Sequence, residues 1–170
     1  IVRISGPDAV SIADSVLSMS KPLAEKKPYT VSFGRLVRKK LAVTSGTSTG
    51  SVTEEEILDE VLVSLFKAPH SFTGEDVVEI AVHGSVYIQR EAIKLLLAAG
   101  CRMADHGEFT KRAFMNGKMD LSQAEAVADV IASRSAASHK VAVSQMRGGF
   151  SRKLQILRAQ LLQFTSLIEL

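Results

Sequence analysis

Residues 57–66 read ILDEVLVSLF, and only one polar residue interrupts the apolar run from Val61 to Phe66. A short run rich in valine, leucine and phenylalanine predicts a β-strand, and its lack of alternation predicts that both faces are buried. The extended run from Tyr29 to Val43 precedes it, and residues 44–51 between the two runs read TSGTSTGS, a loop composition. The two runs therefore predict a β-hairpin.

Further elements are predicted on both sides of this hairpin. Alternating residues predict a strand over 1–4, and Ser5-Gly6-Pro7 separates it from a helix expected over 8–19. After the hairpin we expect a strand over 77–82, a helix over 85–99 and a short strand over 101–104. Together these elements predict an α+β domain, with a mixed sheet and flanking helices, that ends near Asp120.

The chain changes character after Asp120. Residues 121–170 contain no proline, and apolar residues recur every three or four positions from Val143 to Ile168. This spacing predicts helices, one of them long and continuous through Gly148-Gly149. The pattern continues to Leu170 without a capping residue, so we expect a helix cut short and a chain that is a piece of a larger protein.

Composition excludes several classes of protein. With 170 residues, 46% of them hydrophobic and 23% charged, the chain is long enough for one sizeable core. Its apolar runs are shorter than the roughly 18 residues that a membrane span needs, and its first residues lack the pattern of a secretory signal. We therefore expect a cytoplasmic protein. Its single cysteine, Cys101, forms no internal disulfide or thiolate metal site.

The net charge of +3 lies mainly in residues 121–170, which hold six Lys or Arg and three Asp or Glu. Such a basic stretch could contact phosphate, but a solvated helix face has the same density of cations. Contact between RNA and residues 147–158 therefore stays open.

Several catalytic and metal motifs are missing. No two of the four histidines, His70, His83, His106 and His139, are three or four residues apart, so no helical metal site is predicted. Gly117-Lys118 has no glycine five residues earlier, as a phosphate loop requires, and residues 116–120 have one residue too many for a guanine-binding Asn-Lys-x-Asp motif. There is no Gly-x-Ser-x-Gly element. We predict no catalytic residue and no metal ligand.

Polar residues gather at three places where elements begin or end, as binding residues often do. Arg3 lies within the apolar first strand, residues 71–76 read SFTGED before the strand over 77–82, and residues 116–121 read NGKMDL. Each has a structural alternative: an arginine on an edge strand, a turn, or an exposed lysine beside a helix cap.

Three stretches carry a resemblance to a known family. They read VRISG (2–6), APHSFTGED (68–76) with HG (83–84), and GEFTKRAFMNGKMDLSQAEAVAD (107–129). In all three the chain resembles the N-terminal part of the tRNA modification GTPases of the MnmE (TrmE) family. The resemblance implies a tetrahydrofolate-binding and dimerisation domain over 1–120, similar to that of glycine cleavage T protein. It also implies that residues 121–170 are the first helices of a truncated helical domain.

The resemblance also implies the function of the full-length protein. Such proteins modify carbon 5 of the wobble uridine in certain tRNAs, together with the flavoprotein MnmG (GidA), which contributes FAD. GTP hydrolysis with K+ and Mg2+ belongs to a GTPase domain that this chain lacks, so we expect the chain alone to be inactive. The expected partners are a second copy, MnmG and tRNA, and no membrane.

By the same resemblance, Arg3, Glu75 and Lys118 are the expected contacts of 5-formyl- or 5,10-methylene-tetrahydrofolate. A reduced pterin presents a ring N–H beside an amine, two donors that a carboxylate such as Glu75 can accept. The two cations suit the carboxylate and carbonyl oxygens of folate. Two alternatives stay open: an aminomethyltransferase of the glycine cleavage kind, and a dimerisation scaffold without a ligand.

Overall fold

The computed structural model describes residues 1–41 and 53–168. The predicted loop at 44–51 lies outside the described residues. The chain forms two separate compact units, Ile1–Phe109 and Thr110–Leu170.

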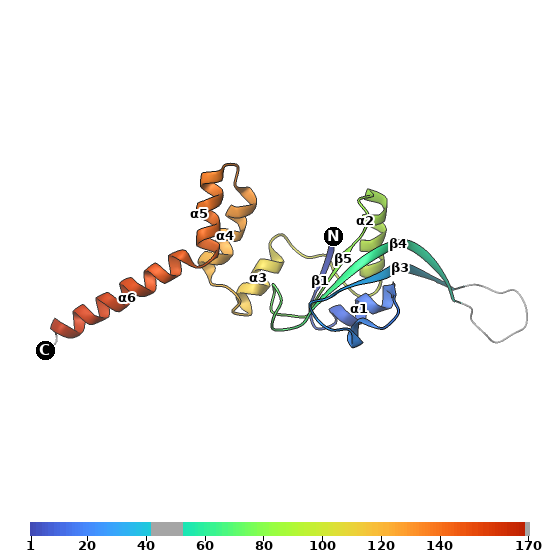
Figure 1. Cartoon of the computed structure of the whole chain (residues 1–170), viewed down its shortest axis with the longest axis horizontal. Helices are drawn as coiled ribbons and strands as arrows, with labels where there is room; N and C mark the ends of the chain where they lie inside the picture. The colour runs from blue at the N-terminus through green and yellow to red at the C-terminus, as the bar shows by residue number, and fades with distance from the viewer. Residues whose placement is uncertain (42–52, 169–170) are drawn as a thin grey trace, which may run out of the picture. The chain divides into compact units, whose positions relative to one another are not determined.

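The first unit contains a five-stranded sheet in the order β1-β5-β4-β3-β2 (Figure 1). The predicted α+β class is confirmed, but the prediction of a mixed sheet is wrong, because every strand pair is antiparallel. The difference arises because β1, the first strand in the chain, pairs antiparallel with β5, the last strand. The strands are β1 (Val2–Ser5), β2 (Leu17–Ser18), β3 (Val31–Leu41), β4 (Thr53–Phe66) and β5 (Val77–Ala81).

The predicted hairpin is confirmed as the antiparallel pair β3 and β4. Burial of both faces of β4 is not observed, since Val61, Val63 and Leu65 are at most 2% exposed whereas Leu62 is 51% exposed. Leu62 points to the opposite face of the sheet from its neighbours, as alternate residues of a strand do. The nearly unbroken apolar run therefore does not distinguish the packed face of β4 from its open face.

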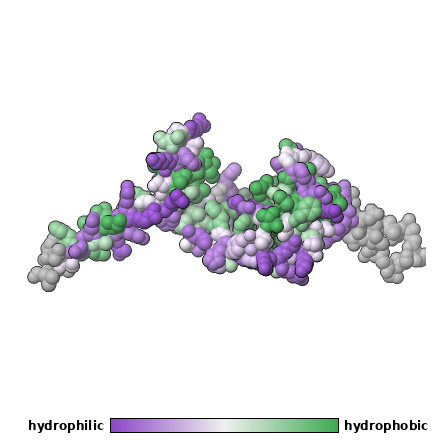
Figure 2. Space-filling view, in the orientation of Figure 1, coloured by the Kyte–Doolittle hydropathy of each residue, from purple (hydrophilic) through white to green (hydrophobic). Residues whose placement is uncertain are grey.

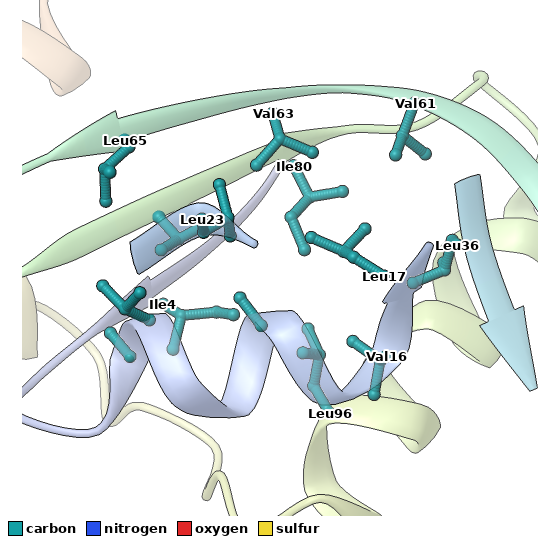
Figure 3. Close-up of a cluster of buried hydrophobic side chains, with 14 of the residues drawn as sticks. Ile4, Val16, Leu17, Leu23, Leu36, Val61, Val63, Leu65, Ile80 and Leu96 are labelled. Carbon is teal, nitrogen blue, oxygen red and sulfur yellow. The ribbon is translucent and has the colours of Figure 1, made fainter. Parts of the chain in front are cut away.

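Two helices cover the packed face of the sheet. The α1 helix (Ala9–Val16) contacts β1, β3 and β5, and the α2 helix (Val86–Ala98) contacts β1 and β4. Figure 3 shows the side chains of Leu65 and Val63 pointing from β4 toward the α1 side of the sheet. Burying each such side chain stabilises the fold by roughly 1.5–3 kcal/mol. A short 3-10 helix, η1 (Leu23–Glu25), adds Leu23 to this core.

The predicted strand over 101–104 is not found; these described residues form no strand or helix. Instead, Arg102 Nη1 donates to Glu108 Oε2 at 2.9 Å, and the same oxygen accepts the N–H of Asp105 at 2.8 Å. Glu108 is the first residue of α3 (Glu108–Met115), a helix that the sequence analysis did not predict. Polar contacts of these side chains therefore replace strand pairing here.

The second unit contains α4 (Leu121–Ala132), α5 (Ala136–Met146) and α6 (Gly149–Ile168). The α4 and α5 helices begin with capping boxes, in which Asp120 pairs with Gln123 and Ser135 with Ser138. The predicted continuous helix through Gly148-Gly149 is wrong. The chain breaks at Gly148, whose φ of 77° is left-handed and ends the helix that precedes it.

Gly148→Ala is expected to lower the free energy of unfolding of the helical unit by about 1 kcal/mol, because a Cβ is strained in the left-handed region. The added Cβ would meet only Gln123 Nε2 at 3.5 Å and Cδ at 3.9 Å, so the cost comes from the backbone. Urea unfolding followed by far-ultraviolet circular dichroism measures it. Gly84→Ala is the control, since that Cβ enters open space. Equal free energies for both variants would contradict the assignment of the helix break to Gly148.

The surface of α6 combines charged and hydrophobic side chains, as Figure 2 shows. Leu154, Leu157 and Leu161 are each about half exposed. None of the helices within residues 1–41 and 53–168 has both the length and the hydrophobicity that a membrane crossing requires.

Candidate functional site

Hydrogen bonds connect Ser5, Thr73 and Glu75 where the end of β1 meets the loop before β5. Ser5 Oγ donates to Glu75 Oε2 at 2.8 Å and lies 2.7 Å from Thr73 Oγ1. Because a hydroxyl has one proton, Thr73 donates to Ser5 in this arrangement. The backbone N–H of Glu75 donates to Thr73 Oγ1, with the nitrogen 3.3 Å from the oxygen, and Thr73 is fully buried. The buried threonine and the serine thus hold the Glu75 carboxylate in a fixed place.

The alternation of β1 explains why Arg3 belongs to the same region. Ile4 points into the core, so Arg3 and Ser5 lie on the opposite face of the strand. In the antiparallel pairing, Arg3 lies opposite Glu79 and Ser5 lies opposite Val77. Arg3 and the serine that contacts Glu75 are therefore neighbours on one side of the sheet.

The guanidinium of Arg3 contacts an acid and two aromatic rings. Arg3 Nε donates to Glu79 Oε1 at 2.7 Å, and Nη2 lies 2.6 Å from the same oxygen. Its Cζ lies 6.0 Å from the ring centroid of Phe72 and 5.6 Å from that of Phe109, within the range of cation–π attraction. These contacts hold the side chain in place, and its five N–H donors allow further acceptors beside Glu79.

Asp76 links the loop that carries Thr73 and Glu75 to Lys67 and Ala68, which follow β4, and to Gly6, which follows β1. Its carboxylate accepts from Lys67 Nζ at 2.8 Å and from the N–H of Ala68 at 2.9 Å, and its carbonyl accepts from the N–H of Gly6 at 3.0 Å. Partial burial acts to raise the pKa of Asp76, but the hydrogen bond from Ala68 and the charge and hydrogen bond of Lys67 outweigh it, so the pKa is lowered.

The lowered pKa predicts how acid affects this loop. A carboxyl group whose pKa falls on folding stabilises the fold above its ordinary value of 3.8, and this contribution is lost as the pH drops through the lower folded pKa. We expect Asp76→Asn to reduce the loss of stability between neutral pH and about pH 2. Urea unfolding followed by tyrosine fluorescence measures this in the first unit, because the chain's two tyrosines are Tyr29 and Tyr87. The same pH dependence in both proteins would contradict the prediction.

His83 has a structural contact rather than a place in this cluster. The buried Asp59 accepts the N–H of His83 at 2.8 Å and lies 2.7 Å from its Nδ1. This pair ties β4 to the connection between β5 and α2. The described residues include no group of three or more His, Cys, Asp or Glu side chains arranged to hold a metal ion.

The structure places two of the three predicted contacts in the same unit. Arg3 and Glu75 belong to the first unit and are linked through Ser5 on β1. Lys118 follows α3 in the second unit, where its N–H donates to the carbonyl of Ala113 at 2.9 Å. Its place beside Arg3 and Glu75 stays a prediction.

The sequence analysis missed several members of the cluster. Ser5 could have been found, because it lies two residues after Arg3 and so shares its strand face. Glu79 and Phe109 could not, because their contacts with Arg3 depend on the β1–β5 pairing and on the path of residues 101–109. Together the cluster presents a carboxylate, a guanidinium and aromatic rings, a donor and acceptor set that fits a planar polar ligand.

Two known protein families match the chain. The family described as GTP-binding protein TrmE N-terminus matches residues 1–118, and the family described as MnmE helical domain matches residues 121–170.

Curated proteins named tRNA modification GTPase MnmE are similar along the whole chain. The protein of Bacteroides thetaiotaomicron is 56% identical over 172 residues, which cover 99% of this chain and 34% of that protein. The protein of Flavobacterium johnsoniae is 54% identical over 172 residues, with 100% and 34% covered. That of Phocaeicola vulgatus is 52% identical over 190 residues, with 100% and 38% covered. This chain thus spans about a third of the length of these relatives, and it belongs to the MnmE (TrmE) family of tRNA modification GTPases.

Proposed function

We propose that residues 1–120 form a domain that binds a one-carbon tetrahydrofolate, 5-formyl- or 5,10-methylene-tetrahydrofolate, and that pairs with a second copy. Residues 121–170 are the first helices of a helical domain. The fold of the first domain is then of the kind found in glycine cleavage T protein. When bound, folate supplies a one-carbon unit.

The observation that carries the folate proposal is the Glu75 carboxylate, which is held by Ser5 of β1, the strand that also carries Arg3. Ser5 donates one hydrogen bond to Glu75 Oε2. A carboxylate has about four acceptor positions, so it can also accept the paired N–H groups of a pterin. Because Thr73 and Ser5 orient it before any ligand arrives, less side-chain entropy is lost on binding.

The cations supply the complementary part of the site. The Arg3 guanidinium, held between Glu79 and two aromatic rings, suits a carboxylate or carbonyl oxygen of folate, and Lys118 provides a second positive charge. The protein's role here is to bind and orient the ligand. No residue of this chain is assigned a catalytic step.

We propose that the longer protein carries out GTP-dependent modification at carbon 5 of the wobble uridine of tRNA. We propose that it acts in the cytoplasm with the flavoprotein MnmG (GidA), which contributes FAD. GTP hydrolysis with K+ and Mg2+ belongs to a GTPase domain outside this chain, so the 170-residue chain is expected to lack that activity.

Titration calorimetry of the chain with 5-formyltetrahydrofolate tests the folate proposal. Saturable heat with one site per chain supports it, and a folded chain that gives no heat contradicts it and favours the scaffold alternative. Sedimentation equilibrium tests the dimer independently, since a monomer at high protein concentration contradicts that part of the proposal.

A further inference from the structure

Thr73 differs from the other polar residues around Glu75 because it is fully buried. Of the residues that the structure describes, the only other buried polar or charged side chain is Asp59, which pairs with His83. Burial of a hydroxyl is unfavourable unless hydrogen bonds satisfy it. A side chain without exposed surface does not reach a ligand that binds at the surface. Any effect of the Thr73 hydroxyl on binding therefore passes through its neighbours.

The hydrogen bonds of the cluster run in one direction, from Thr73 to Ser5 and from Ser5 to Glu75. The proton of Thr73 occupies one side of Ser5 Oγ, so the single proton of Ser5 is directed to Glu75 Oε2. Without the Thr73 proton, the Ser5 hydroxyl would be free to rotate. Thr73 Oγ1 also accepts the N–H of Glu75, so Thr73 holds the backbone of this residue directly and its carboxylate through Ser5.

Other hydrogen bonds hold the main chain of the same loop. The N–H of Gly6 donates to the carbonyl of Asp76 at 3.0 Å, and Ser71 Oγ donates to the carbonyl of Glu75 at 2.6 Å. These bonds connect the loop to the end of β1 and close it on itself. Loss of the Thr73 hydroxyl is therefore expected to loosen the Glu75 side chain more than the path of the loop.

We infer that Thr73 is a positioning residue of the folate site, and that its hydroxyl sets the affinity through Ser5 and Glu75. The inference rests on the proposed function, because the ligand is the pterin that Glu75 would accept. A binding group held in one orientation by buried neighbours loses less freedom when the ligand arrives. The threonine thus contributes to affinity from a place that the ligand does not touch.

Thr73→Val separates the hydroxyl from the packing, since the two side chains have nearly the same shape. In calorimetry with 5-formyltetrahydrofolate we expect Thr73→Val to weaken binding by about tenfold, the effect of one neutral hydrogen bond. Thr73→Ser keeps the hydroxyl and should bind nearly as tightly as the unsubstituted chain. Thr30→Val is the matched control, because the exposed Thr30 also donates a hydrogen bond, to the carbonyl of Lys27 at 2.7 Å, and its loss should leave binding unchanged.

A double-mutant cycle distinguishes positioning of Glu75 from a general structural role. In Glu75→Ala there is no carboxylate to orient, so adding Thr73→Val should weaken binding no further. A threonine that only supports the loop would cause the same loss in both backgrounds, because independent effects add. The cycle thus measures the path through Glu75 and not the stability of the loop.

Circular dichroism shows whether Thr73→Val folds. If it does not, Ser5→Ala supplies the test, since it removes the donor to Glu75 and should also weaken binding by about tenfold. Full-strength binding by either folded variant overturns the inference. So does binding by Thr73→Ser that is as weak as that by Thr73→Val, or an equal loss in the Glu75→Ala background.

The same titrations separate this inference from the folate proposal. Undiminished heat from folded Thr73→Val beside normal heat from the unsubstituted chain removes only the role of Thr73. A folded, unsubstituted chain that gives no heat contradicts the folate site itself, and the positioning role is then lost with it.

Discussion

Glu75→Gln is expected to weaken the binding of 5-formyltetrahydrofolate by about a hundredfold. The substitution keeps the size of the side chain but replaces one acceptor oxygen by an NH₂ group, which faces the donors of the pterin instead of accepting from them. A hydrogen bond to a charged group contributes roughly 1.5–3 kcal/mol, and a donor left unsatisfied adds to the cost. About 3 kcal/mol corresponds to about two orders of magnitude in the dissociation constant. Titration calorimetry measures the change.

Glu25→Gln is the matched control for this substitution. Glu25 is an exposed glutamate at the end of η1, remote in sequence from the cluster, and the same change of charge there should leave folate heat unaltered. A circular dichroism spectrum like that of the unsubstituted chain shows that Glu75→Gln still folds. Full-strength binding by folded Glu75→Gln protein would remove the carboxylate from the folate site.

The position of polar residues at the ends of elements drew attention to Arg3 and to the run that contains Glu75. Each also had a structural alternative, and the resemblance to the MnmE family selected them as folate contacts. The period of two also places Ser5 on the same face as Arg3. What the residue pattern could not supply was the pairing of β1 with β5, since a contact between residues more than seventy positions apart depends on the packing of the whole sheet.

The errors also have physical causes. The run from Val61 to Phe66 suggested burial on both faces because hydrophobicity alone does not show which face helices cover. The pattern through Gly148 suggested one helix because periodicity does not register a single residue with positive φ. The helix over Glu108–Met115 was missed because its start depends on the contact of Glu108 with Arg102.

Loss of a side chain is expected to lower the free energy of unfolding more on the packed face of the sheet than on the open face. Ile80→Ala is expected to lower the free energy of unfolding of the first unit by about 3 kcal/mol, because Ile80 is 1% exposed and its loss leaves a cavity beneath α1. Urea unfolding followed by tyrosine fluorescence measures this change, since both tyrosines of the chain lie in this unit.

Leu62→Ala removes the same number of carbon atoms from the other face of the same sheet. Leu62 is 51% exposed, so its loss leaves no enclosed cavity and should cost less than about 1 kcal/mol. The contrast between the two variants measures how unequally the faces contribute to stability. Because the open face contributes little, its exposed side chains can serve binding without endangering the fold. Equal losses in both variants would mean that the open face is packed in solution, and a second copy of the chain would then be the simplest cover for it.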